Sequence, residues 1–180
     1  MKLVRLRLHL VRELLDDKEL NLKVILLIRD PRGVMQSRTH CDFCHTPDCL
    51  DDSLLCADMI RDYVAASRIL HEYPDKLMVL RFEELALNLK KTAHRIVKFL
   101  RLSPVPSLRK FLRSHSNVNK TSPYSTFRVS RKVPFKWKHL LPFEYVEKIQ
   151  TQDVCQDALH LWGYKMAHNR THLISKNFNP

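Results

Sequence analysis

Glycine and long apolar runs are scarce in this chain. Only two glycines, Gly33 and Gly163, occur among 180 residues, against nine prolines, so few positions suit the glycine-containing loops that wrap phosphate groups closely. No apolar run approaches the ~20 residues that cross a bilayer. The basic, apolar start, MKLVRLRLHLVRELL, has neither a continuous signal-type core nor a small-residue cleavage site. The sequence therefore offers no targeting or membrane-spanning segment.

Acidic residues are also in short supply. Nineteen Asp and Glu face 31 Lys and Arg, which gives a formal net charge of +12. This excess favours anionic partners, whether nucleotides, sulfated or phosphorylated substrates, nucleic acid or an acidic membrane surface, without choosing among them. Because 44% of the residues are hydrophobic, the chain can build a core, and its length suggests one domain.

The apolar pattern alternates between strand and helix. Strands are expected at 24–28 and 77–82, and helices from Pro31, over 51–73, from Asn88 to about residue 100, and over 143–161. Residues 4–10 alternate like a strand before a short helical segment at 10–15. Residues 103–142 predict an irregular basic segment. This order predicts an α/β fold with a parallel sheet covered by helices.

The stretch VILLIRDPRGVMQSR, residues 24–38, predicts a strand-to-helix junction. Five branched apolar residues suit a strand buried on both faces, Asp30 can cap the helix and Pro31 suits its first position. Arg29 then stands at the carboxyl end of the strand, where ligands bind in open parallel sheets. A phosphate site and a capped turn with solvated arginines both explain these residues.

Four cysteines lie close together, at 41, 44, 49 and 56, with His40 and His45 among them and Cys155 far away. A CxxC spacing permits zinc, but no second CxxC or HxxxH follows at a familiar distance, so disulfides in an oxidising compartment are favoured. The sequons at Asn119 and Asn169 agree with such a compartment.

Two further groups have alternative explanations. Glu83 and Glu84 follow the second strand and are either a catalytic base or, as favoured, a pair at a helix start. Phe135, Trp137 and Phe143 are interleaved with lysines and form either a stacking platform for single-stranded nucleic acid or the anchors of a basic lid.

Four segments, in order, resemble the carbohydrate sulfotransferases, particularly the Golgi enzymes that sulfate the 6-hydroxyl of N-acetylglucosamine or galactose. The segment LNLKVILLIRDPRGVMQSR is similar to that family's 3′-phosphate-binding segment, and VLRFEELALN to its R-[YF]-E-[DE]-L stretch. The late segment SPYSTFRVSRKVPFKWKHLL resembles its basic loop with a T-x-R-x-S pattern, and VCQDALHLWGY its closing helix. The resemblance covers about residues 2–165 and leaves 166–180 as a tail.

The resemblance implies a P-loop-like α/β sulfotransferase fold and the donor 3′-phosphoadenosine 5′-phosphosulfate (PAPS). Arg29 and Ser37 would hold its 3′-phosphate, Arg32 would assist, and Arg128 and Ser130 would close over the nucleotide. The acceptor would be a glycan on a glycoprotein or proteoglycan, in the Golgi lumen, with no role for nucleic acid. No catalytic residue and no metal ligand are assigned.

One feature of that family has no counterpart here. Its Ser/Gly-containing loop after the first strand, which cradles the 5′-phosphosulfate, is expected before Met1, as is its membrane anchor. The sequence therefore resembles an N-terminally truncated, C-terminal part of a single domain, and we expect it to be inactive alone. A non-catalytic binder of anionic glycans or nucleotides is the alternative, and a nucleic-acid-binding module is less favoured.

Overall fold

The structure, a computed structural model, describes residues 1–3, 6–103, 106–118 and 125–179. Its sheet within those residues has two strands, β1 (Val24–Ile28) and β2 (Leu77–Arg81), paired in parallel from Val24 opposite Leu77 to Ile28 opposite Arg81. Parallel strands need a crossover connection. It is made here by α2 (Pro31–Arg38) and α3 (Asp52–Glu72). The predicted α/β class is confirmed.

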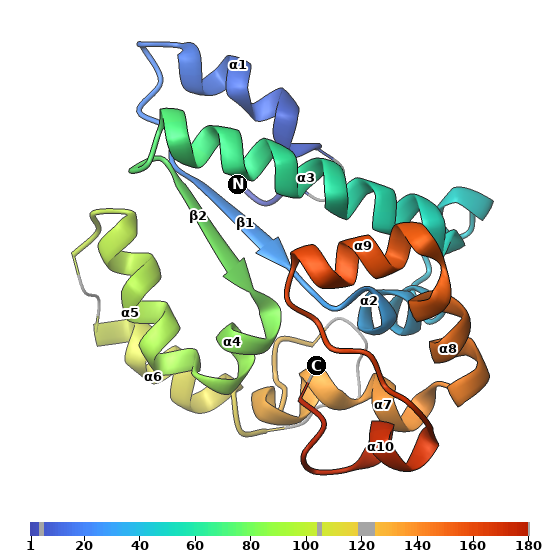
Figure 1. Ribbon diagram of the computed structural model, residues 1–180. Coiled ribbons are helices and arrows are strands. Elements are labelled where there is room, and N and C mark those ends of the chain that lie inside the picture. Colours follow the sequence, from blue (N-terminus) through green and yellow to red (C-terminus); the bar gives the residue numbers. More distant parts are fainter. Residues whose placement is uncertain (4–5, 104–105, 119–124, 180) are drawn as a thin grey trace.

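Helices surround this pair of strands (Figure 1). The remaining ones are η1 (Leu8–Leu10), α1 (Val11–Asp16), η2 (Pro47–Leu50), α4 (Phe82–Leu87), α5 (Leu89–Phe99), α6 (Pro106–His115), η3 (Ser130–Phe135), α7 (Trp137–Leu140), α8 (Phe143–Thr151), α9 (Asp153–Leu161) and α10 (Arg170–Ile174). Figure 1 shows α3 and α9 together on one side of the strands, with α5 and α6 on the other. Both strands therefore end between two groups of helices.

The main core lies between α3, α9 and one face of the strands. Ile28, Met59 and Leu159 are buried there. The opposite face of β1 is open, because Leu27 is 51% exposed. The prediction that β1 is buried on both faces is therefore wrong at Leu27, where the face of β1 opposite α3 and α9 lacks helical cover.

Several helical boundaries differ from those expected. The predicted helix 143–161 breaks at Gln152, whose backbone is extended (φ −70°, ψ 130°) and whose side chain contacts Ser53 and Asp52.

Residues 103–142 are less irregular than predicted: α6 begins at Pro106, a residue that suits a first helical position. Asn88 precedes α5 without a capping side-chain hydrogen bond, after the unpredicted α4. At the N-terminus, the expected strand is replaced by η1 within the described residues.

Two disulfides are present, and the preference for disulfides is confirmed. Cys44 bonds Cys49, and Cys56 on α3 bonds Cys155 on α9. Cys155 is distant in sequence, but α3 and α9 pack side by side and bring the two sulfurs together. Cys41 is a free thiol. In the described parts of the chain, no group of three or more His, Cys, Asp or Glu side chains could hold a metal ion.

The segment after residue 165 packs against α7. Leu173 and Phe178 are buried in one cluster with Trp137. Lys138 donates from Nζ to the carbonyls of Ser175 (3.2 Å) and Phe178 (2.7 Å), and burial lowers its pKa. Among the described helices, none combines the length and apolarity required to cross a bilayer.

Candidate functional site

The junction between β1 and α2 is held by Asp30. Its Oδ1 accepts a hydrogen bond from the Arg32 backbone N–H at 2.9 Å, and Pro31 occupies the first turn of α2. The predicted cap is therefore confirmed. The start of α2 is fixed in position, and its backbone N–H groups and positive dipole end give it affinity for anions.

Arg32 lies inside the protein, fully buried. Its guanidinium forms an ion pair with Asp30 at 2.7 Å and donates to the Gln150 side chain and the Lys165 carbonyl. A fully desolvated guanidinium needs such partners, since an unpaired buried charge is strongly destabilising. These contacts join α2 to α8 and to the segment after α9, and they direct Arg32 away from solvent.

Arg29 lies at the end of β1 with unused hydrogen-bonding capacity. Its Nε is buried and has no hydrogen-bond partner among the described residues. The guanidinium lies over the Phe82 ring, 4.8 Å from its centroid. Burial lowers the pKa of Arg29, while the carboxylates of Glu83 and Asp30 oppose that shift. An arginine remains charged under these conditions, so this site presents a partly desolvated cation with a free donor.

The indole N–H of Trp137 is a second buried donor, and it lies beside Gly33 on α2. A Cβ placed on Gly33 would lie 2.8 Å from Trp137 Cδ1 and 3.3 Å from both Arg29 Nε and Trp137 Nε1. The indole Nε1 is also buried without a partner within the described residues. The missing side chain of Gly33 therefore allows Arg29 and Trp137 to approach α2 closely.

Ser37 lies one helical turn beyond Gly33. Residues four apart share a face of a helix, so Gly33 and Ser37 fall on one stripe that starts beside Arg29. Ser37 is half-buried, and its hydroxyl makes no hydrogen bond within the described part of the chain. A residue eight positions after Arg29 therefore lies on this stripe, one turn further from Arg29 than Gly33.

Glu83 connects the two strand ends. Its Oε1 accepts from the Asp30 backbone N–H at 3.2 Å and its Oε2 from the Tyr164 hydroxyl at 3.0 Å. Burial, followed by the Glu83 charge, raises the pKa of Tyr164 far above its usual range. Arg81 lies 4.2 Å over the Tyr164 ring. Glu83 thus positions both junctions, while Glu84 pairs with Arg95 on the surface.

The late basic segment borders this region. The Arg128 backbone donates to the His115 carbonyl and the Ser130 backbone to the Ser116 carbonyl, both at 2.9 Å. η3, which begins at Ser130, packs against α4, and α7 packs against α2. Trp137 is fully buried and Lys138 is 5% exposed, so of the two alternatives for this segment the stacking platform for nucleic acid does not hold at Trp137.

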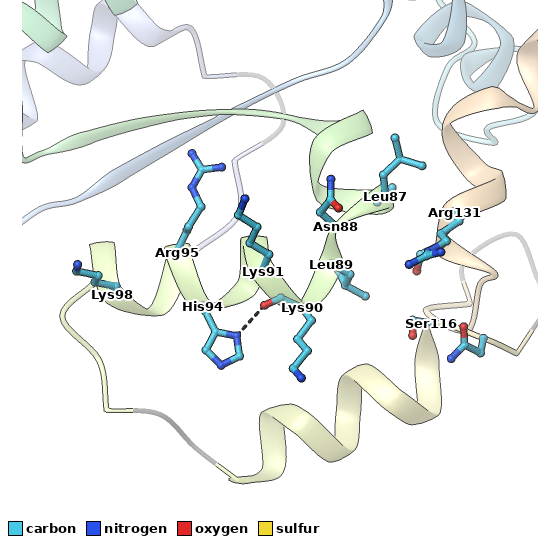
Figure 2. A pocket seen from close by; sticks show the side chains of 13 residues that line it. Leu87, Asn88, Leu89, Lys90, Lys91, His94, Arg95, Lys98, Ser116 and Arg131 are labelled. Carbon is cyan, nitrogen blue, oxygen red and sulfur yellow. Dashed lines mark hydrogen bonds between the residues drawn. The ribbon is translucent and has the colours of Figure 1, made fainter. Parts of the chain in front are cut away.

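A groove of about 910 Å³ opens beside Ser130. α5 runs along it, and residues after α6 and at the start of η3 close one end (Figure 2). Its polar lining includes Ser116, Asn117 and several cations of α5. The groove is therefore polar and basic, and among the described residues that line it are neither Arg29 nor Ser37.

The sequence predicts Arg29 and Ser37 as ligands of the donor, and this stays a prediction. It gave no such role to Trp137 or Tyr164, and it missed the connection that Glu83 makes between the two junctions. Gly33 was the available signal, because one of only two glycines falls within the first turn of a helix, where its cost needs a structural reason. The close approach of Trp137 to Gly33 could not be predicted from the sequence, because it depends on the packing of α7 against α2.

Comparison with known proteins agrees with this architecture. The family described as the sulfotransferase domain matches residues 2–163. Carbohydrate sulfotransferase 1 of Mus musculus is 31% identical over 91% of this chain and 44% of its own length. Carbohydrate sulfotransferase 3 of Tetronarce californica is 28% identical over 98% of this chain and 44% of its own length. The chain thus spans less than half of these curated relatives, and no solved structure matches it.

Proposed function

The chain belongs to the sulfotransferase domain family, and from that premise we propose that it binds PAPS by its 3′-phosphate and serves transfer of sulfate to a carbohydrate hydroxyl. The proposed acceptor is the 6-hydroxyl of N-acetylglucosamine or galactose in a glycan. The curated relatives are named as carbohydrate sulfotransferases, which supports this substrate class.

The observation that carries the proposal is the unpartnered, buried Nε of Arg29 at the start of α2. A phosphate oxygen there would accept charge-assisted hydrogen bonds from Arg29 and align with the α2 dipole. The Ser37 hydroxyl would add a donor from the same helix face. We assign Arg128 and Ser130 to the closure over the nucleotide, and Arg32 to positioning Asp30 and the start of α2.

Sulfuryl transfer also requires the 5′-phosphosulfate to be held in line with the acceptor while negative charge on the leaving oxygen is stabilised. The second strand–helix junction in the described residues, after β2, carries buried Glu83 at the start of α4. The two glycines of the sequence, Gly33 and Gly163, lie on α2 and after α9, so this junction offers no glycine for a loop that wraps a phosphosulfate closely. We therefore propose that residues 1–180 bind the donor through its 3′-phosphate and do not turn over alone. A labelled-sulfate assay beside a longer chain with an upstream strand–loop–helix tests this, and turnover by residues 1–180 would contradict it.

The Golgi lumen is the proposed location. Two disulfides suit an oxidising compartment. The Asn169 sequon is exposed at the start of α10, where a glycan could be attached, whereas the Asn119 sequon lies outside the described residues.

The direct test compares two isomeric ligands of equal charge. Calorimetric titration should show tighter binding of adenosine 3′,5′-bisphosphate than of adenosine 2′,5′-bisphosphate, because only the former places a phosphate at Arg29. Equal affinity for both isomers would contradict the proposed 3′-phosphate site.

A further inference from the structure

Two buried hydrogen-bond donors lie close together at the start of α2, and neither has an acceptor among the described residues. They are Nε of Arg29, at the end of β1, and Nε1 of Trp137, at the start of α7. A Cβ on Gly33 would lie 3.3 Å from each of these nitrogens. Both donors therefore border one point above the first turn of α2.

The absence of an acceptor for these two donors is unfavourable in a closed protein. A buried N–H group without a partner has lost its hydrogen bonds to water and has gained none in return. The penalty grows when the donors are neighbours, because the positive edge of an indole ring and a guanidinium cation repel each other. An oxyanion placed between the two nitrogens would remove both penalties.

The carboxylates near this point are already engaged. The charges of Asp30 and Glu83 act on Arg29, but both oxygens of Asp30 accept hydrogen bonds from the Arg32 side chain. Glu83 accepts from the Asp30 backbone with one oxygen and from the Tyr164 hydroxyl with the other. The two donors therefore await an acceptor that none of the described residues provides.

The indole of Trp137 is held in one orientation. Its ring is fully buried, and the guanidinium of Arg32 lies over it, 4.7 Å from the ring centroid. Leu173, on α10, and Phe178 pack in the same cluster, and Figure 1 shows α10 next to α7. A donor fixed in this way loses little conformational freedom when a ligand arrives, which favours binding.

We propose that the indole N–H of Trp137 is a second ligand of the nucleotide 3′-phosphate, beside the guanidinium of Arg29. The inference rests on the proposed function, which places that phosphate at Arg29, and it adds a donor from α7. One phosphate carries several oxygens, so it can accept from both nitrogens at the usual distances of about 2.7–3.0 Å. The first turn of α2, whose backbone N–H groups have no partner within the helix, lies beside the same point.

This pair of donors selects an ionised oxyanion. A guanidinium and an indole N–H donate hydrogen bonds and accept none, so neither can receive the proton of a hydroxyl or of a water molecule. A nucleotide with a free 3′-hydroxyl lacks the oxygens that reach both nitrogens, and sites built to hydrogen-bond a group discriminate strongly against analogues without it. Trp137 therefore contributes to the preference for a 3′-phosphate and not to affinity for the rest of the nucleotide.

The indole N–H can be observed directly in a proton–nitrogen NMR spectrum of residues 1–180. The chain has two tryptophans, and Trp162 is an internal reference because its Nε1 already donates to the Met59 carbonyl at 2.9 Å. Saturating adenosine 3′,5′-bisphosphate should move the Trp137 indole proton signal downfield, since a hydrogen bond to an anion deshields the proton. The Trp162 signal should stay in place.

Adenosine 2′,5′-bisphosphate is the control ligand, because it has the same charge with the phosphate on the neighbouring hydroxyl. It should move the Trp137 signal far less than the 3′,5′ isomer does. A Trp137 signal that stays in place with the 3′,5′ isomer, or that moves equally with both isomers, would overturn the proposal.

A matched pair of variants measures the contribution of the donor. Trp137→Phe keeps an aromatic ring and removes the N–H, so it should weaken binding of adenosine 3′,5′-bisphosphate by about tenfold or more and that of adenosine 5′-monophosphate by less than about threefold. Trp162→Phe removes the other buried indole N–H and should leave both affinities unchanged. Equal losses for the two nucleotides in Trp137→Phe, or no loss for the bisphosphate, would contradict the assignment.

The same titrations separate this inference from the proposed function. If the unmodified chain prefers adenosine 3′,5′-bisphosphate over its 2′,5′ isomer while the Trp137 signal does not move, the role of Trp137 is refuted and the phosphate site at Arg29 stands. If the chain prefers neither isomer, the proposed 3′-phosphate site is refuted, and this inference with it.

Discussion

The carboxylate of Glu83 accepts a hydrogen bond from the backbone N–H of Asp30 at 3.2 Å. This contact joins the two strand–helix junctions, because Glu83 starts α4 after β2 and Asp30 caps α2 after β1. The other oxygen of Glu83 accepts from Tyr164. One buried carboxylate therefore fixes the geometry in which Arg29 is held.

Glu83→Ala should destabilise the protein strongly. It leaves the Asp30 N–H and the Tyr164 hydroxyl unpaired in a buried site and removes the negative charge beside Arg29, at a cost of about 2–5 kcal/mol. Tm should fall by roughly 5–15 °C. Glu84→Ala is the control, since its ion pair with Arg95 is partly exposed and should contribute less than about 1 kcal/mol. Similar Tm values for both variants would contradict the role given to Glu83.

Gly33→Ala should be destabilising although alanine favours helices. The new Cβ would lie 2.8 Å from Trp137 Cδ1, and Trp137 is fully buried and cannot yield freely. Overpacking of this kind costs about 1–3 kcal/mol, against about 1 kcal/mol gained in helix propensity. Urea unfolding should show a lower midpoint than for Gln36→Ala on the same helix. A higher midpoint for Gly33→Ala would mean that Trp137 does not need the glycine.

The two disulfides should contribute unequally. Cys56 and Cys155 are 99 residues apart and Cys44 and Cys49 only five, and the entropy removed from the unfolded chain grows with loop length. The chain-entropy model gives about 4.7 kcal/mol for the long loop and about 2 for the short one. The variant that lacks the long-range disulfide, Cys56→Ser/Cys155→Ser, should therefore unfold at a lower denaturant concentration than the variant that lacks the short one, Cys44→Ser/Cys49→Ser.

Thiol titration of the unfolded, oxidised protein should find one free thiol, Cys41, and three or more would contradict the pairing.

Stability at acidic pH should depend on Asp62. Burial raises the pKa of Asp62 above its ordinary value, although its carboxylate accepts from the Leu8 backbone N–H. A raised native pKa means that the folded state binds the Asp62 proton more tightly than the unfolded state does. Protonation of Asp62 therefore stabilises the fold at low pH, and this stabilisation is lost as pH rises through the native pKa. Asp62→Asn keeps an acceptor for Leu8. Its stability relative to the unmodified protein should increase from pH 3.5 to pH 6, and a constant difference would contradict the assignment.

Local sequence signals sufficed for β1, β2, α2 and α3. The run of branched residues at 24–28 and the Asp30-Pro31 start are short-range features, and the strand and the capped helix that they predict are confirmed. The helix expected over 51–73 is α3 (Asp52–Glu72). The exposure of Leu27 could not be predicted, because whether a helix covers that face depends on how distant segments pack.

Tertiary contacts decided the rest. Arg32 and Arg29 are three residues apart in one motif, yet Arg32 is bound by Gln150 and the Lys165 carbonyl while the Nε of Arg29 is unpartnered. The two arginines differ because α8 and the segment after α9 supply hydrogen-bond acceptors to Arg32. The pairing of Cys56 with Cys155 likewise follows from the packing of α3 on α9.

The central claim is that Arg29 recognises the 3′-phosphate of the nucleotide, and a four-way titration tests it most directly. The unmodified chain and Arg29→Ala are each titrated with adenosine 3′,5′-bisphosphate and adenosine 5′-monophosphate, with Arg68→Ala as a control from an exposed part of α3. A lost charge-assisted contact should weaken bisphosphate binding by about 1.5–3 kcal/mol, or roughly 10- to 150-fold. Monophosphate binding should be unchanged in all three proteins. An equal loss for both ligands, or no loss for the bisphosphate, would contradict the account.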